Sequence, residues 1–454
     1  MSLLALRPHA ASPAPVLSSA SSRRHELGQR RQHIGLVNAL IAVLLVWGGS
    51  ATSGLADEIV PAAAAPRWWK GNIHTHTFWS DGNDFPEMVA EWYRTRDYNF
   101  LALSDHNVLA QGIRWMPEER VLSRGGADVI EKYLGRFGPA WVERRGEGEA
   151  AEIRLKPFDE FRSLVEERGQ FLMIPAEEIS DAVDGKPVHI NASNIAEPIQ
   201  PVGGQTVSEA IQNNLRAVQE QAEKAGRSIL AHLNHPNFGY AVTPADLAHA
   251  TLERHFEVFN GHPSVNQLGS DEKPSIEQLW DIANVIRLAE LQAPPLFGVA
   301  TDDSHDYHSG PGSRQSSRPG RGWVMVRASH LTPEKIIQAL QAGDFYGSSG
   351  VTLRDVQFDA ASRVLTVDIE PSGNATYTTR FIGSFAGVNG DPPRIGVELA
   401  AVEGHSASYT LSGEELYVRA VISSSDAPFD PVWEGQQQQA WTQPVGWRQS
   451  AEGN

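Results

Sequence analysis

Histidines and acidic residues recur in this sequence directly after short apolar runs. The five groups are His74 with His76, Asp105 with His106, Glu177 with Glu178, His232 with His235, and Asp302 and Asp303 with His305. Imidazole nitrogens and carboxylate oxygens are protein ligands that divalent metal ions accept. The chain has no cysteine, so thiolate ligands and disulfides are excluded. The pattern therefore indicates a metal centre with nitrogen and oxygen ligands.

Local spacing supports shared ligand roles. In an extended strand His74 and His76 point to the same side, because strand side chains alternate with a period of two. Ser80-Asp81-Gly82 is a turn sequence that can return Asp81 to the same place. Asp303 and His305 repeat the one-residue spacing with mixed ligands. A water molecule held between two such ions becomes a nucleophile near neutral pH, which is the chemistry of a hydrolase.

Neighbouring residues compete for some of these roles. Pro236 turns the chain out of a strand directly after His235, which favours His235 as a ligand and leaves His232 to support it. One residue of the pair Glu177 and Glu178 is expected to make a structural contact instead.

Other candidates have ordinary interpretations. Asp302 can cap the turn that follows it, and His189 alone resembles a common strand histidine. Histidines outside the five groups, such as His262 and His308, are interpreted as surface or core residues. Arg321, in Gly-Arg-Gly, is expected either to meet an anionic substrate or, slightly favoured, to be a solvated loop arginine.

The apolar runs predict buried strands at 100–103, 171–174, 229–231, 256–259 and 296–300. Amphipathic segments between them predict helices, one over 207–225 with Thr206 and Glu209 as a capping pair, and one beginning at Pro86. This alternation predicts an α/β fold with a parallel sheet, open or closed into a barrel, whose strand ends converge on one face. Residues 112–156 interrupt the alternation and are interpreted as an insertion that could form a lid over the site.

After Gly350 the pattern changes to alternating apolar and polar residues, as in Leu365, Val367 and Ile369. This alternation predicts half-buried strands of a small all-β sandwich. We therefore expect a signal peptide and linker at 1–66, a hydrolase domain at 67–350 and a β-sandwich domain at 351–454.

The N-terminal residues resemble an export signal. Basic residues precede an apolar run at 34–47, and small residues follow it. We expect an exported protein, periplasmic or secreted, with no stable membrane span after cleavage; the alternative is a membrane anchor formed by the same apolar segment. The formal net charge of -17 argues against nucleic acid as a partner. The oligomeric state is left open.

The motifs GNIHTHTFWSDG, LALSDHN, IPAEEIS, HINASN, NHPNF, EVFNG and DDSH occur in this order between residues 68 and 350. Together they resemble the PHP (polymerase and histidinol phosphatase) superfamily of metallohydrolases, and GDFYGSSGV resembles its branch of carbamate-ester hydrolases. The resemblance implies a distorted seven-stranded (β/α) barrel, followed by the sandwich, with two or three Zn, Mn or Fe ions. The ligands it implies are His74, His76, Asp81, His106, Glu178, His189, His235, Asp303 and His305. The insertion at 112–156 departs from compact members of the superfamily.

The leading hypothesis is a metal-dependent hydrolase that uses a metal-bridged hydroxide on a small phosphoester. Asp303, as a proton donor to the leaving group, and His235 are the candidate catalytic residues. The first alternative is hydrolysis of a carboxylic ester, a carbamate ester or an amide at the same site. The alternative of another class is a non-catalytic exported protein that binds glycans or cell-wall polymer.

Overall fold

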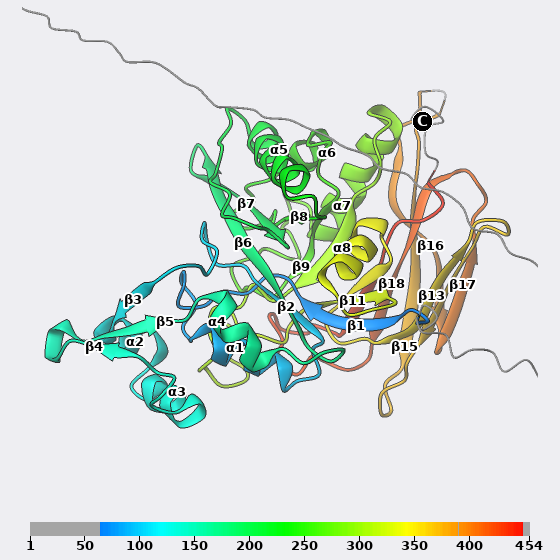
Figure 1. The fold of residues 1–454 in the computed structure, drawn as a ribbon. Helices are drawn as coiled ribbons and strands as arrows, with labels where there is room; N and C mark the ends of the chain where they lie inside the picture. Colours follow the sequence, from blue (N-terminus) through cyan, green and yellow to red (C-terminus); the bar gives the residue numbers. More distant parts are fainter. Residues whose placement is uncertain (1–63, 389, 448–454) are drawn as a thin grey trace, which may run out of the picture. The chain divides into compact units, whose positions relative to one another are not determined.

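A mixed sheet of thirteen strands forms the centre of the fold (Figure 1). The computed structural model describes residues 64–388 and 390–447. In spatial order, the strands are β10 (Phe297–Thr301), β9 (His255–Asn260), β8 (Leu230–Leu233), β7 (Lys186–Ser193), β6 (Leu172–Val183), β2 (Phe100–Leu103), β1 (Arg67–Asn72), β11 (Trp323–Ala328), β12 (Phe345–Ser348), β19 (Gln439–Thr442), β18 (Glu415–Ser424), β15 (Tyr377–Phe385) and β16 (Arg394–Glu403). All five strands predicted from the apolar runs are present, and β6 extends well beyond its predicted end.

The sheet is mixed rather than parallel. Strands β1, β2 and β6 pair in parallel, as do β8, β9 and β10, but β7 is antiparallel to both β6 and β8. The expectation of a parallel sheet is wrong at β11 and β12, which pair antiparallel to their neighbours. It is also wrong at β7, because Asp184 and Gly185 form a two-residue hairpin loop. Both residues have positive φ, 50° and 76°, which is the backbone conformation of the tight turns that match strand twist. The hairpin brings the beginning of β7, rather than its end, to the site.

The sheet curls so that the segments following β1 and β10 meet. A parallel bridge joins Thr75 to Ser304, and the Asp303 N–H donates to the His74 carbonyl at 3.0 Å. One buried apolar cluster includes side chains from β1, β2, β6, β8, β10, β11 and β12, so the curled sheet encloses a common core. The architecture is therefore mixed α/β with a large central sheet, while closure by seven strands stays a prediction.

Six helices flank this part of the sheet among the described residues. They are α1 (Pro86–Arg94), α4 (Phe158–Val165), α5 (Val207–Ala225), α6 (Pro244–His249), α7 (Ile276–Val285) and α8 (Pro333–Ala342). The predictions for α5 and for the start of α1 are confirmed. The Thr206 side chain accepts from the Glu209 N–H, and Gly226 ends α5 with φ of 63°. Helix α5 contacts β6, β7 and β8, and α7 contacts β9 (Figure 1).

The interruption at 112–156 folds as a small unit. It contains β3 (Arg114–Pro117), α2 (Glu118–Gly125), α3 (Val129–Phe137), β4 (Arg144–Arg145) and β5 (Glu152–Leu155), and its strands form a sheet in the order β3-β5-β4. Its apolar side chains share one buried cluster with those of α1 and α4. In Figure 1 these elements lie together beside α1 and α4. Whether the insertion moves as a lid stays a prediction.

The C-terminal strands continue the central sheet, because β12 pairs with β19 and β19 with β18. A separate sheet of β13 (Leu353–Asp359), β14 (Val364–Ile369) and β17 (Ser406–Thr410) shares a buried apolar cluster with β15 and β18. The sandwich, and the domain boundary at 350, stay predictions.

The expectation of half-buried C-terminal strands is wrong for β18, which is largely buried on both faces. Its second face packs near α7, where the Arg419 guanidinium donates to the Asp281 carboxylate at 2.9 and 2.7 Å. The Tyr417 hydroxyl donates to the same carboxylate at 2.6 Å. Tyr417 and Arg419, the polar side chains that alternate along this strand, therefore contact the buried Asp281 carboxylate instead of facing solvent.

The predicted export signal lies almost entirely outside the described residues, and its cleavage and localisation stay predictions. Within residues 64–388 and 390–447, no helix combines the length and the apolar character that a membrane crossing needs.

Candidate metal centre

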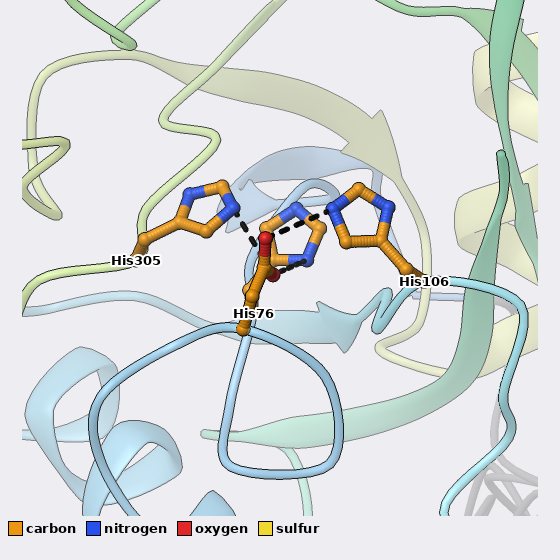
Figure 2. Close-up of side chains that lie close together, drawn as sticks. His76, His106 and His305 are labelled. Atoms are coloured by element: carbon orange, nitrogen blue, oxygen red, sulfur yellow. Dashed lines mark ion pairs between the residues drawn. The ribbon is translucent and has the colours of Figure 1, made fainter. Parts of the chain in front are cut away.

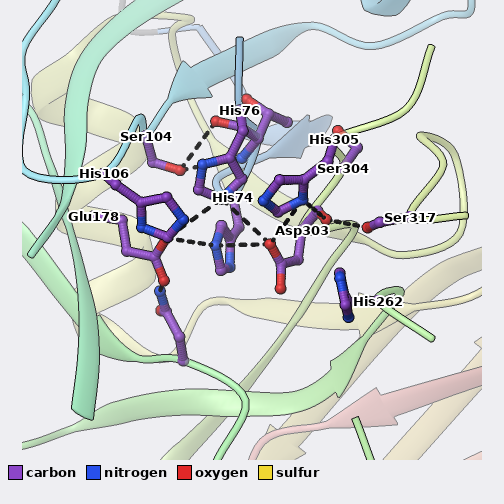
Figure 3. A network of polar contacts seen from close by, with 12 residues as sticks. His74, His76, Ser104, His106, Glu178, His262, Asp303, Ser304, His305 and Ser317 are labelled. Carbon is purple, nitrogen blue, oxygen red and sulfur yellow. Dashed lines mark hydrogen bonds and ion pairs between the residues drawn. The ribbon is translucent and has the colours of Figure 1, made fainter. Parts of the chain in front are cut away.

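All nine predicted ligands lie in one connected network where the curled sheet brings its strand ends together. Figure 3 shows His74, His76, His106, Glu178, Asp303 and His305 among them. Each side chain lies within 3.6 Å of at least one other member of the set. That they bind metal stays a prediction, but their spatial convergence is a property of the fold.

His74 and His76 extend β1 toward the centre, and both are fully buried. The Nε2 atoms of both rings lie 3.2 Å from Asp303 Oδ1, and they lie 3.5 and 3.3 Å from Glu178 Oε2. Both Nε2 atoms and Glu178 Oε2 are buried without a hydrogen-bond partner among the described residues. Buried polar atoms nearly always have a hydrogen-bond partner, so three ligand atoms that lack a hydrogen bond and face one another fit a cation.

Glu178 is the carboxylate at the middle of the network. Its Oε1 atom lies 3.0 Å from His189 Nδ1 and 3.5 Å from His235 Nε2, while Oε2 lies 2.8 Å from His106 Nδ1. Its two oxygens therefore face different groups of imidazoles, as a carboxylate shared between ions must. Glu177 points away and accepts a hydrogen bond from the Ile199 N–H at 2.5 Å, because adjacent strand residues face opposite sides.

A second group of ligand atoms lies nearer the surface. His76, Asp81, His106 and His305 each offer an atom within 4.8 Å of the others. Figure 2 shows the three imidazole rings, whose nearest nitrogens lie 3.6, 3.4 and 3.3 Å from Asp81 oxygens for His76, His106 and His305. The Asp81 side chain is 57% exposed, whereas the side chains of the other eight are at most 28% exposed. We call this group the outer cluster.

Two predicted ligands have left-handed backbone conformations that non-glycine residues rarely adopt. His235 has φ of 24° and Asp303 has φ of 49°. Surrounding hydrogen bonds hold both: the His235 N–H donates to Glu257 Oε2 at 2.6 Å, and the Ser317 hydroxyl donates to the Asp303 carbonyl. Such strain commonly occurs at functional sites, and here it directs two polar side chains into the centre.

Electrostatics keep the central carboxylates ionised. Burial raises the pKa of Glu178, but the nearby His106, His74 and His189 outweigh it and hold that pKa well below its usual range. For Asp303, burial is likewise outweighed, chiefly by His74, and the pKa is lowered. Ionised carboxylates are the form that metal ions bind.

The His76 ring is held neutral. Burial and the adjacent His305 lower its pKa to about 3. A neutral imidazole keeps a lone pair for coordination, so His76 is in the state that a ligand needs. The rings of His74 and His76 thus point to the same centre, but different charged groups surround them.

The most important contact that the sequence patterns did not assign is that of Glu257. Its Oε1 lies 2.6 Å from His74 Nδ1 and accepts from the Thr301 hydroxyl at 2.6 Å. A carboxylate behind a histidine fixes the ring's tautomer and directs its other nitrogen toward a metal. The signal was present, since Glu257 is an acidic residue within the apolar strand β9, where only a functional or structural partner allows burial. His232 also lies beside Glu257, with its Nε2 at 3.7 Å from Oε1, as expected of a residue that supports the ligands without being one of them.

The alternatives for Asp302 and Arg321 are now decided. Asp302 accepts hydrogen bonds from the backbone N–H groups of Gly320, Arg321 and Gly322, so it organises that loop. Arg321 is 1% exposed and donates to Asp430 at 3.0 Å, so it is neither a solvated arginine nor a group that meets substrate. Both sequence interpretations of Arg321 were wrong because its partner lies 109 residues away.

The fold and the site define an α/β protein with a candidate centre for several divalent ions. No protein-family model and no curated protein matches the sequence. Among solved structures, a two-domain protein from Bacteroides vulgatus, described as containing a predicted PHP-like metal-dependent phosphoesterase, is similar with 13% identity and a TM-score of 0.38, over 85% of this chain and 97% of that chain. A protein from Bifidobacterium adolescentis, provisionally named a metal-dependent phosphoesterase, has 14% identity and a TM-score of 0.29, over 53% of this chain and 89% of that chain. Likenesses with TM-scores below 0.5 assign neither a superfamily nor an activity to this chain.

Proposed function

We propose that this protein is a metal-dependent hydrolase and that its substrates are small phosphoesters. The observation that supports this most directly is a group of three buried atoms that lack a hydrogen bond in the described structure and lie close together, namely His74 Nε2, His76 Nε2 and Glu178 Oε2. The outer cluster and the group of His106, Glu178 and His189 offer places for further ions. We propose two or three ions, with Zn, Mn or Fe as the candidates because the ligands are imidazole and carboxylate.

The chain's own residues have separable roles in this proposal. We call the place faced by His74 Nε2, His76 Nε2 and Glu178 Oε2 the inner position. His74, His76 and Asp303 would hold an ion there, and Glu178 links it to the imidazoles on its other side. Glu257 orients His74, and Asn260 Nδ2 donates to Asp303 Oδ2 at 3.2 Å, which leaves Oδ1 facing the histidines. When bound, divalent ions at these positions would polarise the ester and lower the pKa of a water molecule. Proton transfer by Asp303 and a catalytic role of His235 stay predictions, as does export through the segment at 34–47.

The test compares metal content and hydrolysis in matched variants. Purified protein is loaded with Mn²⁺ or Zn²⁺, its metal is counted by elemental analysis, and p-nitrophenyl phosphate and a naphthyl ester are assayed side by side. We expect metal-dependent phosphatase activity that is lost in His74→Ala and retained in His330→Ala, a variant of an exposed histidine. Hydrolysis of the naphthyl ester alone would shift the assignment to carbonyl esters, and protein without bound metal would refute the proposal.

A further inference from the structure

Asp81 differs from the other candidate ligands in how the fold supports it. It lies outside any helix or strand, in the loop between β1 and α1, and it is the most exposed of the nine. Its carboxylate accepts a hydrogen bond from the adjacent Ser80 hydroxyl at 3.3 Å. A ligand on such a loop needs external support, because loops are more mobile than the elements they connect.

The 112–156 insertion provides that support through Arg124 of α2. Its guanidinium donates to the backbone carbonyls of Ser80, at 2.9 Å, and of Gly82. These are the residues directly before and after Asp81. A single side chain therefore holds the backbone on both sides of a candidate metal ligand by hydrogen bonds. Among the described residues, Arg124 forms no ion pair with the Asp81 carboxylate itself.

Packing around these hydrogen bonds is tight. A Cβ at Gly82 would lie 2.4 Å from the His76 carbonyl group, and a Cβ at Gly125 would lie 2.8 Å from the Asn83 carbonyl oxygen. The end of α2 thus lies directly on the loop, and the loop lies directly on the HxH segment. Arg114 of β3 adds a second contact, donating to the Trp79 carbonyl at 2.5 Å. The insertion therefore contacts the loop between β1 and α1 at Trp79, Ser80 and Gly82.

We propose that Arg124 is a positioning residue for the metal ion of the outer cluster, acting through the backbone of Asp81. This inference rests on the proposed function, since it requires that Asp81 bind an ion. It assigns a role to the insertion: its α2 helix determines how strongly the outermost ion is held, and the ions of the inner position do not depend on it.

An arginine suits this task for a geometric reason. The planar guanidinium presents several N–H groups in a fixed fork, so it can span two carbonyls, whereas a lysine ammonium is a single point on a flexible stem. With its donors directed at carbonyls, Arg124 leaves the Asp81 oxygens facing His106 and His305, at 3.4 and 3.3 Å. A direct Arg124–Asp81 ion pair would instead compete with the metal ion.

The experiment measures metal affinity in the full chain by calorimetric titration of Mn²⁺ into metal-free protein. The variants are Arg124→Ala, Arg124→Lys, Asp81→Ala, the double variant, and Arg120→Ala as a matched control from an exposed position one turn earlier in α2. We expect Arg124→Ala to weaken one binding step by about 10- to 100-fold, the range found when supporting residues of metal ligands are removed. Arg124→Lys should weaken it less, and Arg120→Ala should not change it.

The double variant decides whether Arg124 acts through Asp81. We expect it to bind metal as Asp81→Ala does, within about twofold, because coupled residues are not additive. Replacement of Mn²⁺ by Co²⁺ gives a second readout: the visible absorption of one ion should change in both single variants and in the same way. Circular dichroism confirms that each variant is folded.

The outcomes separate this inference from the proposed function. If the unmodified protein binds no metal, both fail. If Asp81→Ala loses one binding step but Arg124→Ala matches Arg120→Ala, the positioning role alone is refuted. An additional loss in the double variant, equal to that of Arg124→Ala alone, would show that Arg124 acts independently of Asp81 and would also refute it.

Discussion

The buried carboxylate of Glu257 allows a quantitative test of how the site is held together. Its two oxygens accept four short hydrogen bonds: Oε1 from His74 Nδ1 and the Thr301 hydroxyl, both at 2.6 Å, and Oε2 from the His235 N–H at 2.6 Å and Asn260 Nδ2 at 2.7 Å. Glutamine has the same shape but only one acceptor oxygen. In Glu257→Gln, an NH₂ group at the Oε2 position would face two N–H donors. At the Oε1 position it would face the Thr301 hydroxyl and His74 Nδ1, which accepts only in the tautomer that carries its proton on Nε2.

The magnitude follows from these contacts. The first orientation loses two hydrogen bonds to a charged group, each worth about 1.5–3 kcal/mol, so the free energy of unfolding should fall by about 3–6 kcal/mol. The second orientation costs less stability, but it places a proton on the His74 nitrogen that faces the other candidate ligands. The His74 ring also loses its carboxylate partner, and metal affinity at the inner position should fall by about 10- to 100-fold. We predict both effects in the same variant, measured by urea unfolding of metal-free protein and by Mn²⁺ titration.

Glu253→Gln is the matched control. Glu253 is also buried, but it precedes β9 at the end of the strand away from the site, and it accepts hydrogen bonds only from the backbone of Arg254 and His255 in the described structure. It should bind Mn²⁺ as the unmodified protein does. If Glu257→Gln and Glu253→Gln have equal metal affinities, the reasoning that Glu257 orients His74 is refuted, whatever their stabilities.

Three further predictions concern stability. Burial raises the pKa of Glu253 from 4.5 to about 8, so between these pH values the folded state holds a proton that the unfolded state has released. The free energy of unfolding therefore falls as pH rises, by roughly 1 kcal/mol per pH unit. In Glu253→Gln the free energy of unfolding, measured with urea, should depend less on pH over this window, and an unchanged slope would contradict the assignment. Arg321→Met should destabilise the protein by about 3 kcal/mol, because it removes one of the two arginines that pair with the buried Asp430 and leaves it with Arg318 and the Gly312 N–H, each at 2.9 Å. A change below 1 kcal/mol by the same assay, roughly that of an exposed pair, would be inconsistent with this. Removal of metal by a chelator should lower the thermal midpoint, since an ion at about 100 times its Kd stabilises the folded state by about 2.7 kcal/mol; identical melting curves before and after chelation would show that no ion binds preferentially to the folded chain.

Much of the candidate site was predictable from local patterns. The HxH spacing, the acidic residues after apolar runs and the turn around Asp81 are signals within a few residues, and the structure brings all nine predicted side chains together. The helix at 207–225 was likewise predictable, because its capping residue and its terminal glycine act locally. The hairpin at Asp184-Gly185 had a local signal too, and its omission produced the wrong expectation of a parallel strand at β7.

The sequence by itself determined the ligand chemistry, since residue types and strand periodicity are encoded position by position. Only the tertiary structure decided which distant residues become partners, both at the ligands and elsewhere in the core. The contacts of Glu257 with His74, of Arg321 with Asp430 and of Arg419 with Asp281 span 183, 109 and 138 residues. Such pairs depend on how the sheet curls and on which strands become neighbours, and no local pattern specifies these, because they result from packing the whole chain around a common core.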